Sequence, residues 1–265
     1  MSGVTDWDGA AYDRLADPQA RWGRAVLSRL ELQGSETVLD AGCGSGRVTK
    51  ALLDRLPRGR VVALDASSSM LSKARSRLSE RLAQVRFVQS DLLKLEPAML
   101  GDDMPVDAVF STATFHWVTD HDVLFANLAS VMRPGAQLVA QCGAEGNIKQ
   151  LLEAVRSLGV KRAGTWLYPS VADTEARLRS AGFTEVQVWT NAEPTLFADR
   201  TVLVDFLEVV CLREHVATLP PAMRRDFVER VAAKMAEPVI DYVRLNIVAR
   251  KSEDDETDWT MPLET

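Results

Sequence analysis

The sequence predicts an α/β fold: a seven-stranded, mostly parallel β-sheet with an antiparallel last strand, helices on both faces, and a helical cap inserted before that strand. Three observations support this fold class. Short apolar runs alternate with amphipathic stretches, a glycine-rich turn follows the first run, and an unusually long segment separates the last two runs. Alternation of strands with helices is typical of βαβ units, whose strands are parallel.

The strands are predicted from short runs rich in valine, leucine and other apolar residues. The first five runs are Thr37–Ala41, Arg60–Leu64, Val85–Gln89, Val106–Phe110 and Gln137–Gln141. The last two are Thr184–Trp189 and Tyr242–Ala249, and the latter alternates between apolar and polar residues. These seven runs make up the predicted sheet.

The helices are predicted where apolar residues recur with a spacing near 3.6. These stretches are Ala10–Leu30, Val48–Leu56, Ser68–Leu82, Asp122–Met132 and Asp173–Ala181. Met132-Arg133-Pro134-Gly135 is expected to end the fourth helix, because proline cannot continue a helix and glycine readily takes a positive φ. Gly182 is expected to end the fifth.

The predicted cap lies between the last two strands, where about forty residues stand in place of the few that a hairpin needs. Thr201–Thr218 and Pro221–Met235 are read as two helices, joined by a turn at Leu219-Pro220-Pro221. The chain is therefore divided into an N-terminal helical lid (1–34), a core (35–194 and 236–251), the cap (195–235) and an acidic tail (252–265) that is expected to be disordered.

The composition limits the function classes. The net charge of −6, with basic residues scattered among acids, argues against nucleic acid as a partner. The three cysteines are far apart, which favours neither a disulfide framework nor a zinc site and fits a reducing cytoplasm. No apolar run approaches the roughly 20 residues that a membrane span needs, so we expect a cytoplasmic protein without a membrane partner.

The segment Val38–Gly46 is the strongest motif, because its glycines lie where a buried strand turns into a helix. Gly42, Gly44 and Gly46 permit a tight turn and a close approach of a ligand to the backbone. A structural turn alone would also need glycine, so the motif depends on its surroundings. Arg47 occupies the position of the third glycine of a dinucleotide motif, which argues against a nicotinamide or flavin site.

Three acidic residues lie at or just after the carboxyl ends of the first three predicted strands. Asp40 precedes the glycine turn, where its carboxylate is suited to a cationic amino-acid moiety through water or backbone. Asp65 ends the second strand and Asp91 follows the third. The carboxyl ends of parallel strands border the ligand crevice, although each acid alone is also explained by solvation or helix capping.

These residues, with Met132-Arg133-Pro134-Gly135, resemble the class I S-adenosylmethionine-dependent methyltransferases, which have a Rossmann-like fold, over roughly residues 20 to 250. The resemblance implies that Asp65 binds the ribose hydroxyls, Asp91 the adenine amino group, and the glycine turn the methionine part, with Asp40 nearby. Ala66 and Leu92 would pack on adenine or ribose. The implied reaction is methyl transfer to a small-molecule acceptor.

The acceptor side is expected at the loop after the fourth strand. His116 is the candidate catalytic residue, either orienting the acceptor or removing a proton, and the alternative is that it only packs with Trp117. The candidate substrate-binding residues are aromatic: Tyr12, Trp22, Trp117, Trp166, Tyr168 and Phe206. No metal is expected, because Asp120 beside His121 is better explained as a helix cap than as a ligand.

Several strings also resemble the trans-aconitate methyltransferase group, whose members make carboxyl methyl esters. These are Trp7-Asp8 with Tyr12-Asp13-Arg14, Phe115–His121, Trp166–Ser170, Thr218–Phe227 and Asp241–Lys251. Pro194-Thr195-Leu196-Phe197 departs from that pattern, which argues against a tricarboxylate acceptor. Four arginines are candidates to meet an anionic acceptor, but a solvated or ion-paired surface position is favoured for each of them: Arg162, Arg200, Arg213 and Arg244.

The favoured reaction is therefore O-methylation of a carboxylate or hydroxyl, since a carboxylate needs no general base. The alternatives are C- or N-methylation of a secondary metabolite on the same fold, a binding module without catalysis, and a nicotinamide-dependent oxidoreductase. The sequence does not identify the acceptor, the oligomeric state or the pathway.

Overall fold

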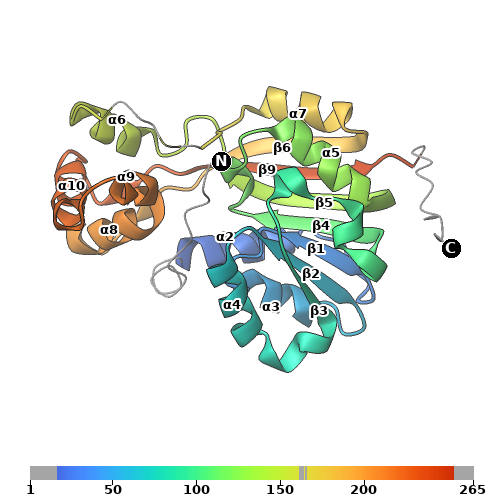
Figure 1. Cartoon of the computed structure of the whole chain (residues 1–265). Helices are drawn as coiled ribbons and strands as arrows, with labels where there is room; N and C mark the ends of the chain where they lie inside the picture. Colours follow the sequence, from blue (N-terminus) through green and yellow to red (C-terminus); the bar gives the residue numbers. More distant parts are fainter. Residues whose placement is uncertain (1–16, 161–163, 165, 254–265) are drawn as a thin grey trace.

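The computed structural model describes residues 17–160, 164 and 166–253. A single seven-stranded sheet forms its centre, in the order β3-β2-β1-β4-β5-β9-β6 (Figure 1). The strands are β1 (Thr37–Ala41), β2 (Arg60–Asp65), β3 (Val85–Gln89), β4 (Val106–Thr112), β5 (Met132–Gly143), β6 (Phe183–Ala192) and β9 (Val243–Lys251). All seven predicted strands are present.

The pairing of the strands confirms the predicted fold class. β1 pairs in parallel with both β2 and β4, so the chain changes direction across the sheet at β1. β9 is antiparallel to β5 and β6, between which it lies. The carboxyl ends of β1 and β4 thus flank the point where open α/β sheets bind ligands.

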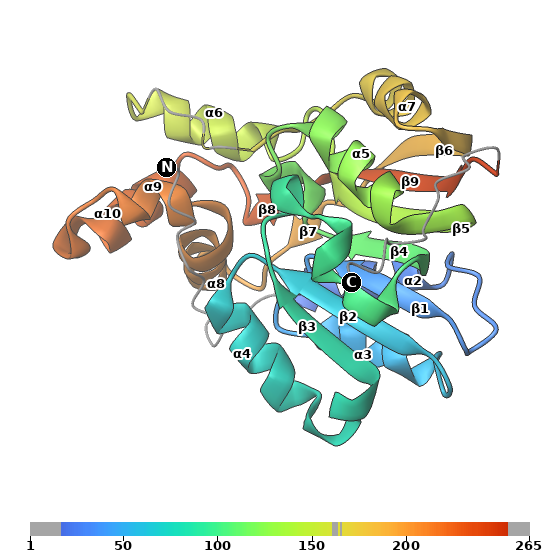
Figure 2. The ribbon, with the colours of Figure 1, turned by 45° about the vertical axis from the view of Figure 1, so that its right-hand side comes forward.

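Helices cover both faces of the sheet (Figures 1 and 2). One face carries α2 (Asp17–Leu27), α3 (Arg47–Asp54) and α4 (Ser68–Arg77), and the other carries α5 (His121–Val131) and α7 (Val171–Ser180). Successive strand residues serve opposite faces: Val38 packs with the first group and Leu39 with the second. Both faces are therefore buried, as the apolar strands require.

Short 3₁₀ turns complete the connections on the core. They are Ser79–Gln84, Leu92–Lys94, Pro97–Met99, Gly101–Asp103 and Phe115–Trp117. The helix predicted over Ser68–Leu82 is shorter than expected, because it ends at Arg77 and continues as the first of these turns.

The motif Met132–Gly135 begins β5 instead of forming a loop before it. Helix α5 ends at Val131, one residue before the predicted end at Met132, and Gly135 has a φ of 71°. The register shifts here: Met132 pairs with Val106, and the next pair is Ala108 with Gln137. The turn residues of the motif are accommodated as a bulge in the strand.

The cap before the last strand consists of α8 (Arg200–Phe206), α9 (Arg213–Ala217) and α10 (Pro221–Ala233). The single helix predicted over Thr201–Thr218 is wrong, because a π-helical turn at Leu207–Cys211 separates α8 from α9. Pro221 lies at the start of α10, as expected. A two-stranded ribbon, β7 (Thr195–Leu196) with β8 (Val239–Ile240), joins the cap to the sheet.

The cap has a hydrophobic core of its own, to which α6 (Lys149–Ser157) contributes Leu151, Ala154 and Val155. The sequence reading assigned no helix to this segment. Figure 1 shows α6, α8, α9 and α10 grouped at one end of the sheet. The cap is therefore built from two segments of the chain, one after β5 and one after β6.

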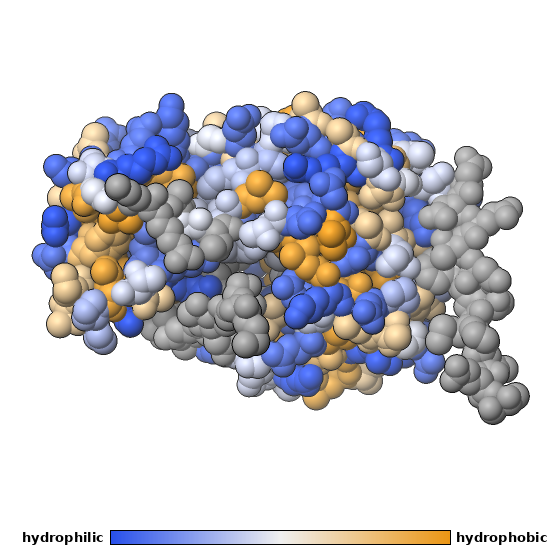
Figure 3. Space-filling view, turned by 45° about the horizontal axis from the view of Figure 1, so that its top comes forward, coloured by the Kyte–Doolittle hydropathy of each residue, from blue (hydrophilic) through white to orange (hydrophobic). Residues whose placement is uncertain are grey.

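Hydrophobic and hydrophilic residues are interspersed on the face of the molecule in Figure 3. Among the described residues, the large hydrophobic side chains that are exposed are scattered: Leu82, Val123, Leu196, Val202 and Met223. None of the described helices combines the length and the apolar character that a membrane crossing requires.

Candidate active site

The glycine turn is tied to the neighbouring strand by its backbone. The amides of Gly42 and Cys43 both donate to the carbonyl oxygen of Leu64, at 2.8 and 2.9 Å. Gly42, Gly44 and Gly46 have positive φ values of 86°, 54° and 78°. Side chains other than hydrogen are strained in this conformation, so the three glycines set the path of the turn.

The three glycines differ in what surrounds them. A Cβ on Gly42 would lie 2.2 Å from Oγ1 of Thr114, and one on Gly46 would lie 3.1 Å from Cα of Ala74. A Cβ on Gly44 would meet no atom within 4 Å. Gly42 and Gly46 therefore serve packing, whereas Gly44 exposes its backbone to open space that a ligand can fill.

Asp65, at the carboxyl end of β2, holds this turn in place. Its Oδ2 accepts a hydrogen bond from the amide of Gly44 at 2.8 Å, and its Oδ1 accepts one from Ser67 at 2.9 Å. Ala66 follows on the partly exposed side of the same edge. The predicted ribose-binding carboxylate thus lies directly beside the open face of Gly44.

Asp91 lies at the end of the adjoining strand β3 and is also partly exposed. Its Oδ1 accepts a hydrogen bond from the amide of Leu93 at 3.0 Å, so it caps the following 3₁₀ turn. Leu92 does not share this exposure. It is buried in the main core, where it packs against other apolar side chains. The prediction that Leu92 packs on the cofactor is therefore corrected.

Asp40 lies beneath the turn and is almost completely buried. Its Oδ2 accepts a hydrogen bond of 2.7 Å from the hydroxyl of Thr49. Burial raises the pKa of this carboxyl to about 7, and the negative charge of Asp65 adds to that rise. The side chain lies under the turn, and its carboxyl group changes protonation near neutral pH because it is buried.

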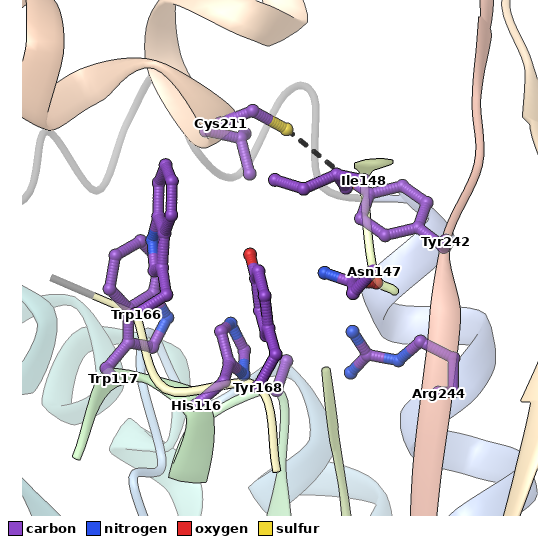
Figure 4. A pocket seen from close by; sticks show the side chains of 11 residues that line it. His116, Trp117, Asn147, Ile148, Trp166, Tyr168, Cys211, Tyr242 and Arg244 are labelled. Carbon is purple, nitrogen blue, oxygen red and sulfur yellow. Dashed lines mark hydrogen bonds between the residues drawn. The ribbon is translucent and has the colours of Figure 1, made fainter. Parts of the chain in front are cut away.

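A pocket lies between the sheet edge and the cap (Figure 4). It is lined by Ala113, His116, Trp117, Asn147, Ile148, Trp166, Tyr168, Val210, Cys211, Tyr242 and Arg244. Ala113 follows β4, so the pocket borders the strand ends described above.

His116 is buried in the wall of this pocket. Its Nδ1 accepts a hydrogen bond from the amide of Gly143 at 3.4 Å, which assigns the proton of the neutral ring to Nε2. Burial lowers the pKa of His116 well below its usual value, and the charge of Arg244 lowers it further. His116 is thus a neutral hydrogen-bond donor, and its basic nitrogen is occupied.

Arg244 is the buried cation of the pocket. Its side chain comes from the start of β9 and is 2% exposed. Nε donates to Oε1 of Gln141 at 3.4 Å, and the guanidinium carbon lies 4.6 Å from the ring centre of Trp22. The expectation that Arg244 is a solvated surface residue is therefore wrong, because β9 is an inner strand of the sheet.

The other arginines grouped with it have different surroundings. Arg200 is exposed and donates to the carbonyl oxygens of Ala232 and Met235, which caps the end of α10. Arg213 is half-buried in α9. Arg162 lies outside the described residues.

The remaining polar groups of the pocket resist ionisation. Burial raises the pKa of Tyr168, and it raises the pKa of Tyr242 well above its usual value. Burial also raises the pKa of the Cys211 thiol to about 12, and its sulfur lies 3.4 Å from the hydroxyl of Tyr242. At neutral pH these side chains are hydrogen-bonding groups and neutral.

Three of the predicted aromatic residues line this pocket, namely Trp117, Trp166 and Tyr168. Trp22 does not, because it packs behind the pocket against Tyr242 with a ring-centre distance of 4.9 Å. Phe206 is also misassigned, since it is fully buried in the cap core against Phe197. Tyr12 lies outside the described residues.

The sequence reading missed several lining residues because they come from separate segments that only the fold brings together. These are Asn147 and Ile148 after β5, Val210 and Cys211 in the π-helical turn, and Tyr242 beside Arg244. Ile148 has a φ of 50°, unusual for a branched residue. In Figure 4, Asn147, Ile148 and Tyr242 lie on the side of the pocket opposite Trp117 and Trp166.

The cluster around His121 is structural. Asp120 caps α5, as expected, because its carboxylate accepts hydrogen bonds from the backbone amides of Asp122 and Val123. The ring of His121 forms a hydrogen bond with the carbonyl oxygen of Phe115. Within the described part of the chain, no group of three His, Cys, Asp or Glu residues is arranged to bind a metal.

Residues 38–135 match the family described as methyltransferase domain. A trans-aconitate 2-methyltransferase from Azoarcus sp. (strain BH72) is 32% identical over 227 residues, which cover 80% of this chain and 86% of that protein. Another, from Methylobacterium nodulans, is 29% identical over 267 residues, which cover 94% of this chain and 100% of that protein.

Among solved structures, one similar chain is phosphoethanolamine N-methyltransferase 2 of Haemonchus contortus, in complex with phosphomonomethylethanolamine and S-adenosylhomocysteine. The TM-score is 0.61 at 19% identity, and the match covers 95% of this chain and 58% of that one. At this identity the likeness concerns the fold.

Proposed function

Because this chain belongs to the S-adenosylmethionine-dependent methyltransferases, we propose that it methylates a carboxylate oxygen of a small organic acid. The family membership decides against a nicotinamide-dependent oxidoreductase and against a module without catalysis. What remains open is the acceptor atom, and the chemistry of the pocket bears on that choice.

The donor side of the proposal uses the strand ends. The open space at Gly44 and the adjoining carboxylate of Asp65 fit a ligand that carries hydroxyl groups and lies against the backbone. Asp91 and Ala66 would extend this contact along the same edge, and Asp40 would support the turn. Bound S-adenosylmethionine would supply an activated methyl group: a carboxylate oxygen would form the new C–O bond while the electrons of the broken C–S bond stay on sulfur, and no proton would be released.

The acceptor side lacks a base among its described residues. A hydroxyl or carbon acceptor has to lose a proton, but Nδ1 of His116 is already occupied by the amide of Gly143. The raised pKa of Cys211 and the tyrosines excludes them as bases near neutral pH. A carboxylate is already ionised, so it suits a pocket in which groups only bind and orient.

The single observation that carries the proposal is the guanidinium of Arg244 in the pocket wall, 2% exposed. A buried guanidinium favours a planar anion, which it can bind through two parallel hydrogen bonds. The Nε2 hydrogen of His116 and the amide of Asn147 are further donors of this pocket. Together these groups would orient a carboxylate and keep water from it.

The position of the transferred label tests this proposal. The full chain is incubated with methyl-radiolabelled S-adenosylmethionine and a panel of small acids, each paired with the matching alcohol and amine. We expect label in the acid products, released as methanol by mild alkali because methyl esters hydrolyse. Alkali-stable label, or transfer to alcohols or amines alone, would overturn carboxylate methylation in favour of ether, carbon or nitrogen methylation.

A further inference from the structure

The hydroxyl group of Tyr168 is a hydrogen-bond donor held in a fixed position in the wall of the pocket. Building on the proposed carboxyl methylation, we infer that this hydroxyl binds one oxygen of the acceptor carboxylate and leaves the other oxygen to attack the methyl group. Tyr168 thereby determines how the acceptor is oriented toward the methyl donor.

The backbone on both sides of Tyr168 is bound to the loops that follow two strands. The amide of Leu167 donates to the carbonyl oxygen of His116 at 2.9 Å, in the turn after β4. The carbonyl oxygen of Pro169 accepts a hydrogen bond of 3.0 Å from the amide of Glu145, which follows β5. These two bonds fix the backbone at Tyr168, so its side chain can move only by changing its own rotamer.

The ring of Tyr168 lies on Gly143, the last residue of β5. A Cβ on Gly143 would lie 2.6 Å from Cε1 of Tyr168, so the ring approaches the strand this closely only because Gly143 has no side chain. The ring also stacks with His116 and with Trp166, at ring-centre distances of 6.0 and 6.1 Å. These neighbours restrict the ring, and in Figure 4 its hydroxyl group points into the pocket.

The hydrogen of this hydroxyl is available to a ligand. The side-chain oxygen of Asn147 accepts a hydrogen bond from the amide of Val243 at 2.9 Å, so its NH₂ group, which can only donate, is turned the other way. Burial raises the pKa of Tyr168, and hydrogen bonding from Asn147 to the Tyr168 oxygen opposes that rise. Among the described residues, no oxygen accepts the hydrogen of Tyr168, which is therefore left for an oxygen of the acceptor.

A single neutral donor suits a carboxylate, whose two oxygens are equivalent until one of them is bound. The oxygen that accepts from Tyr168 is held still, and the second oxygen forms the new C–O bond while the electrons of the broken C–S bond stay on sulfur. Tyr168 keeps its hydrogen throughout. After transfer the bound oxygen is the carbonyl oxygen of a neutral ester, to which the same hydrogen bond is weaker, so the product is released more readily than the acid.

Carbon-13 NMR of the full chain tests the inference. The chain contains three tyrosines, so labelling the ring carbon that carries the hydroxyl gives three resonances, and the one that is lost in Tyr168→Phe belongs to Tyr168. The probes are benzoate, hexanoate and trans-aconitate, added to protein saturated with S-adenosylhomocysteine, and their methyl esters are the neutral controls. We expect at least one of the acids to shift the Tyr168 resonance, and its ester to shift it by less than half as much.

Calorimetry with the same acids measures the contribution of the hydroxyl. Tyr168→Phe keeps the ring on Gly143 and removes only the oxygen, so it should weaken binding of the tightest of the three acids at least fivefold. The melting temperature and the dissociation constant of S-adenosylhomocysteine should stay unchanged. The matched control is Ser170→Ala in the same segment, whose hydroxyl accepts a hydrogen bond from the amide of Asp173 at 3.1 Å and caps α7. It should lower the melting temperature and leave the affinity for the acids unchanged.

The outcomes separate this inference from the proposed function. If none of the acids shifts the Tyr168 resonance, or if Tyr168→Phe binds them as tightly as the unaltered chain, the inference is overturned. If alkali-labile label nevertheless enters an acid, the proposed function stands and only the role of Tyr168 fails. If label goes only to alcohols or amines, the proposed function itself fails, and the inference fails with it.

Discussion

Arg29, which follows helix α2, donates a hydrogen bond of 2.6 Å to the side-chain oxygen of Asn246 in the inner strand β9. The same oxygen accepts a hydrogen bond from Gln141 at 2.9 Å, and the oxygen of Gln141 accepts the one from Nε of Arg244. A continuous set of side chains thus connects a helix on the sheet face with the guanidinium of the pocket. This set fixes where Arg244 can point.

Asn246→Leu should raise the KM for the acid acceptor about threefold to tenfold and leave the cofactor dissociation constant unchanged. The substitution removes the side-chain oxygen to which both Arg29 and Gln141 donate, and it should lower the free energy of unfolding by roughly 1–3 kcal/mol. Steady-state kinetics, cofactor calorimetry and thermal melting measure the three effects. Asn191→Ala is the control, because Asn191 accepts a hydrogen bond from the side-chain nitrogen of Asn246 and is not part of the connection between Arg29 and Arg244. A drop in stability without any change in KM would show that the network does not position Arg244.

Gly44→Ala should weaken binding of S-adenosylhomocysteine at least tenfold, because the methyl group would enter the open space beside Asp65. The left-handed φ of 54° adds a strain of about 1 kcal/mol to folding. Gly182→Ala is the matched control: its φ is 84°, its Cβ would also meet nothing within 4 Å, and it lies at the end of α7. Equal affinities of the two variants would place the ligand elsewhere.

Asp65→Ala should weaken binding of S-adenosylhomocysteine at least tenfold, equivalent to ~1.4 kcal/mol. The change removes an anionic acceptor and also releases the amides of Gly44 and Ser67. Asp65→Asn, which keeps one acceptor oxygen, should lose less. Calorimetry on both variants, with circular dichroism to verify folding, decides the matter, and an unaltered affinity in a folded Asp65→Ala protein would remove this residue from the site.

The stability of the protein without cofactor should fall as the pH rises from 5 to 8. The pKa of Asp40 is about 7 in the folded state against 3.8 as its ordinary value, so the folded state binds the proton more tightly. The contribution is complete below pH 3.8 and is lost as the pH rises through 7. Asp40→Asn should reduce the difference between the melting temperatures at pH 5 and pH 8. The same difference in both proteins would mean that Asp40 is not the titrating group.

Phe206→Ala and Val210→Ala should separate stability from acceptor binding in the cap. Phe206 is fully buried against Phe197, so its truncation should cost about 3–5 kcal/mol and lower the melting temperature. Val210 lines the pocket, so its truncation should raise the acceptor KM about threefold at a smaller cost in stability. Melting curves and acceptor kinetics test the pair, and the reverse assignment of effects would contradict the placement of the pocket.

The local features of the fold could be predicted from the sequence, because they depend on neighbouring residues. The glycine turn, the helix cap at Asp120 and the stop at Gly182 are examples, each with its reason within a few residues. The extension of β5 through Met132–Gly135 was missed because proline and glycine are turn residues, and only pairing with β4 makes this segment a bulged strand.

The pocket could not be predicted, since its residues are brought together by the tertiary structure. The alternation in the last strand placed Arg244 and Asn246 on one face, but it did not reveal that β9 lies between β5 and β6 with both faces covered. A polar face on an inner strand is a signal for a buried site, and recognising it requires the strand order. The break in the cap helix at Leu207–Cys211 was missed because a π-helical turn keeps an apolar pattern.

The ribbon of β7 and β8 has a consequence for how such proteins diversify. The chain leaves for the cap and returns from it through paired neighbours, Thr195 with Ile240 and Leu196 with Val239. An insertion whose two ends lie side by side can change in length or be exchanged without shifting the register of any strand in the sheet. The cap can therefore change the acceptor side of the site without altering the glycine turn after β1.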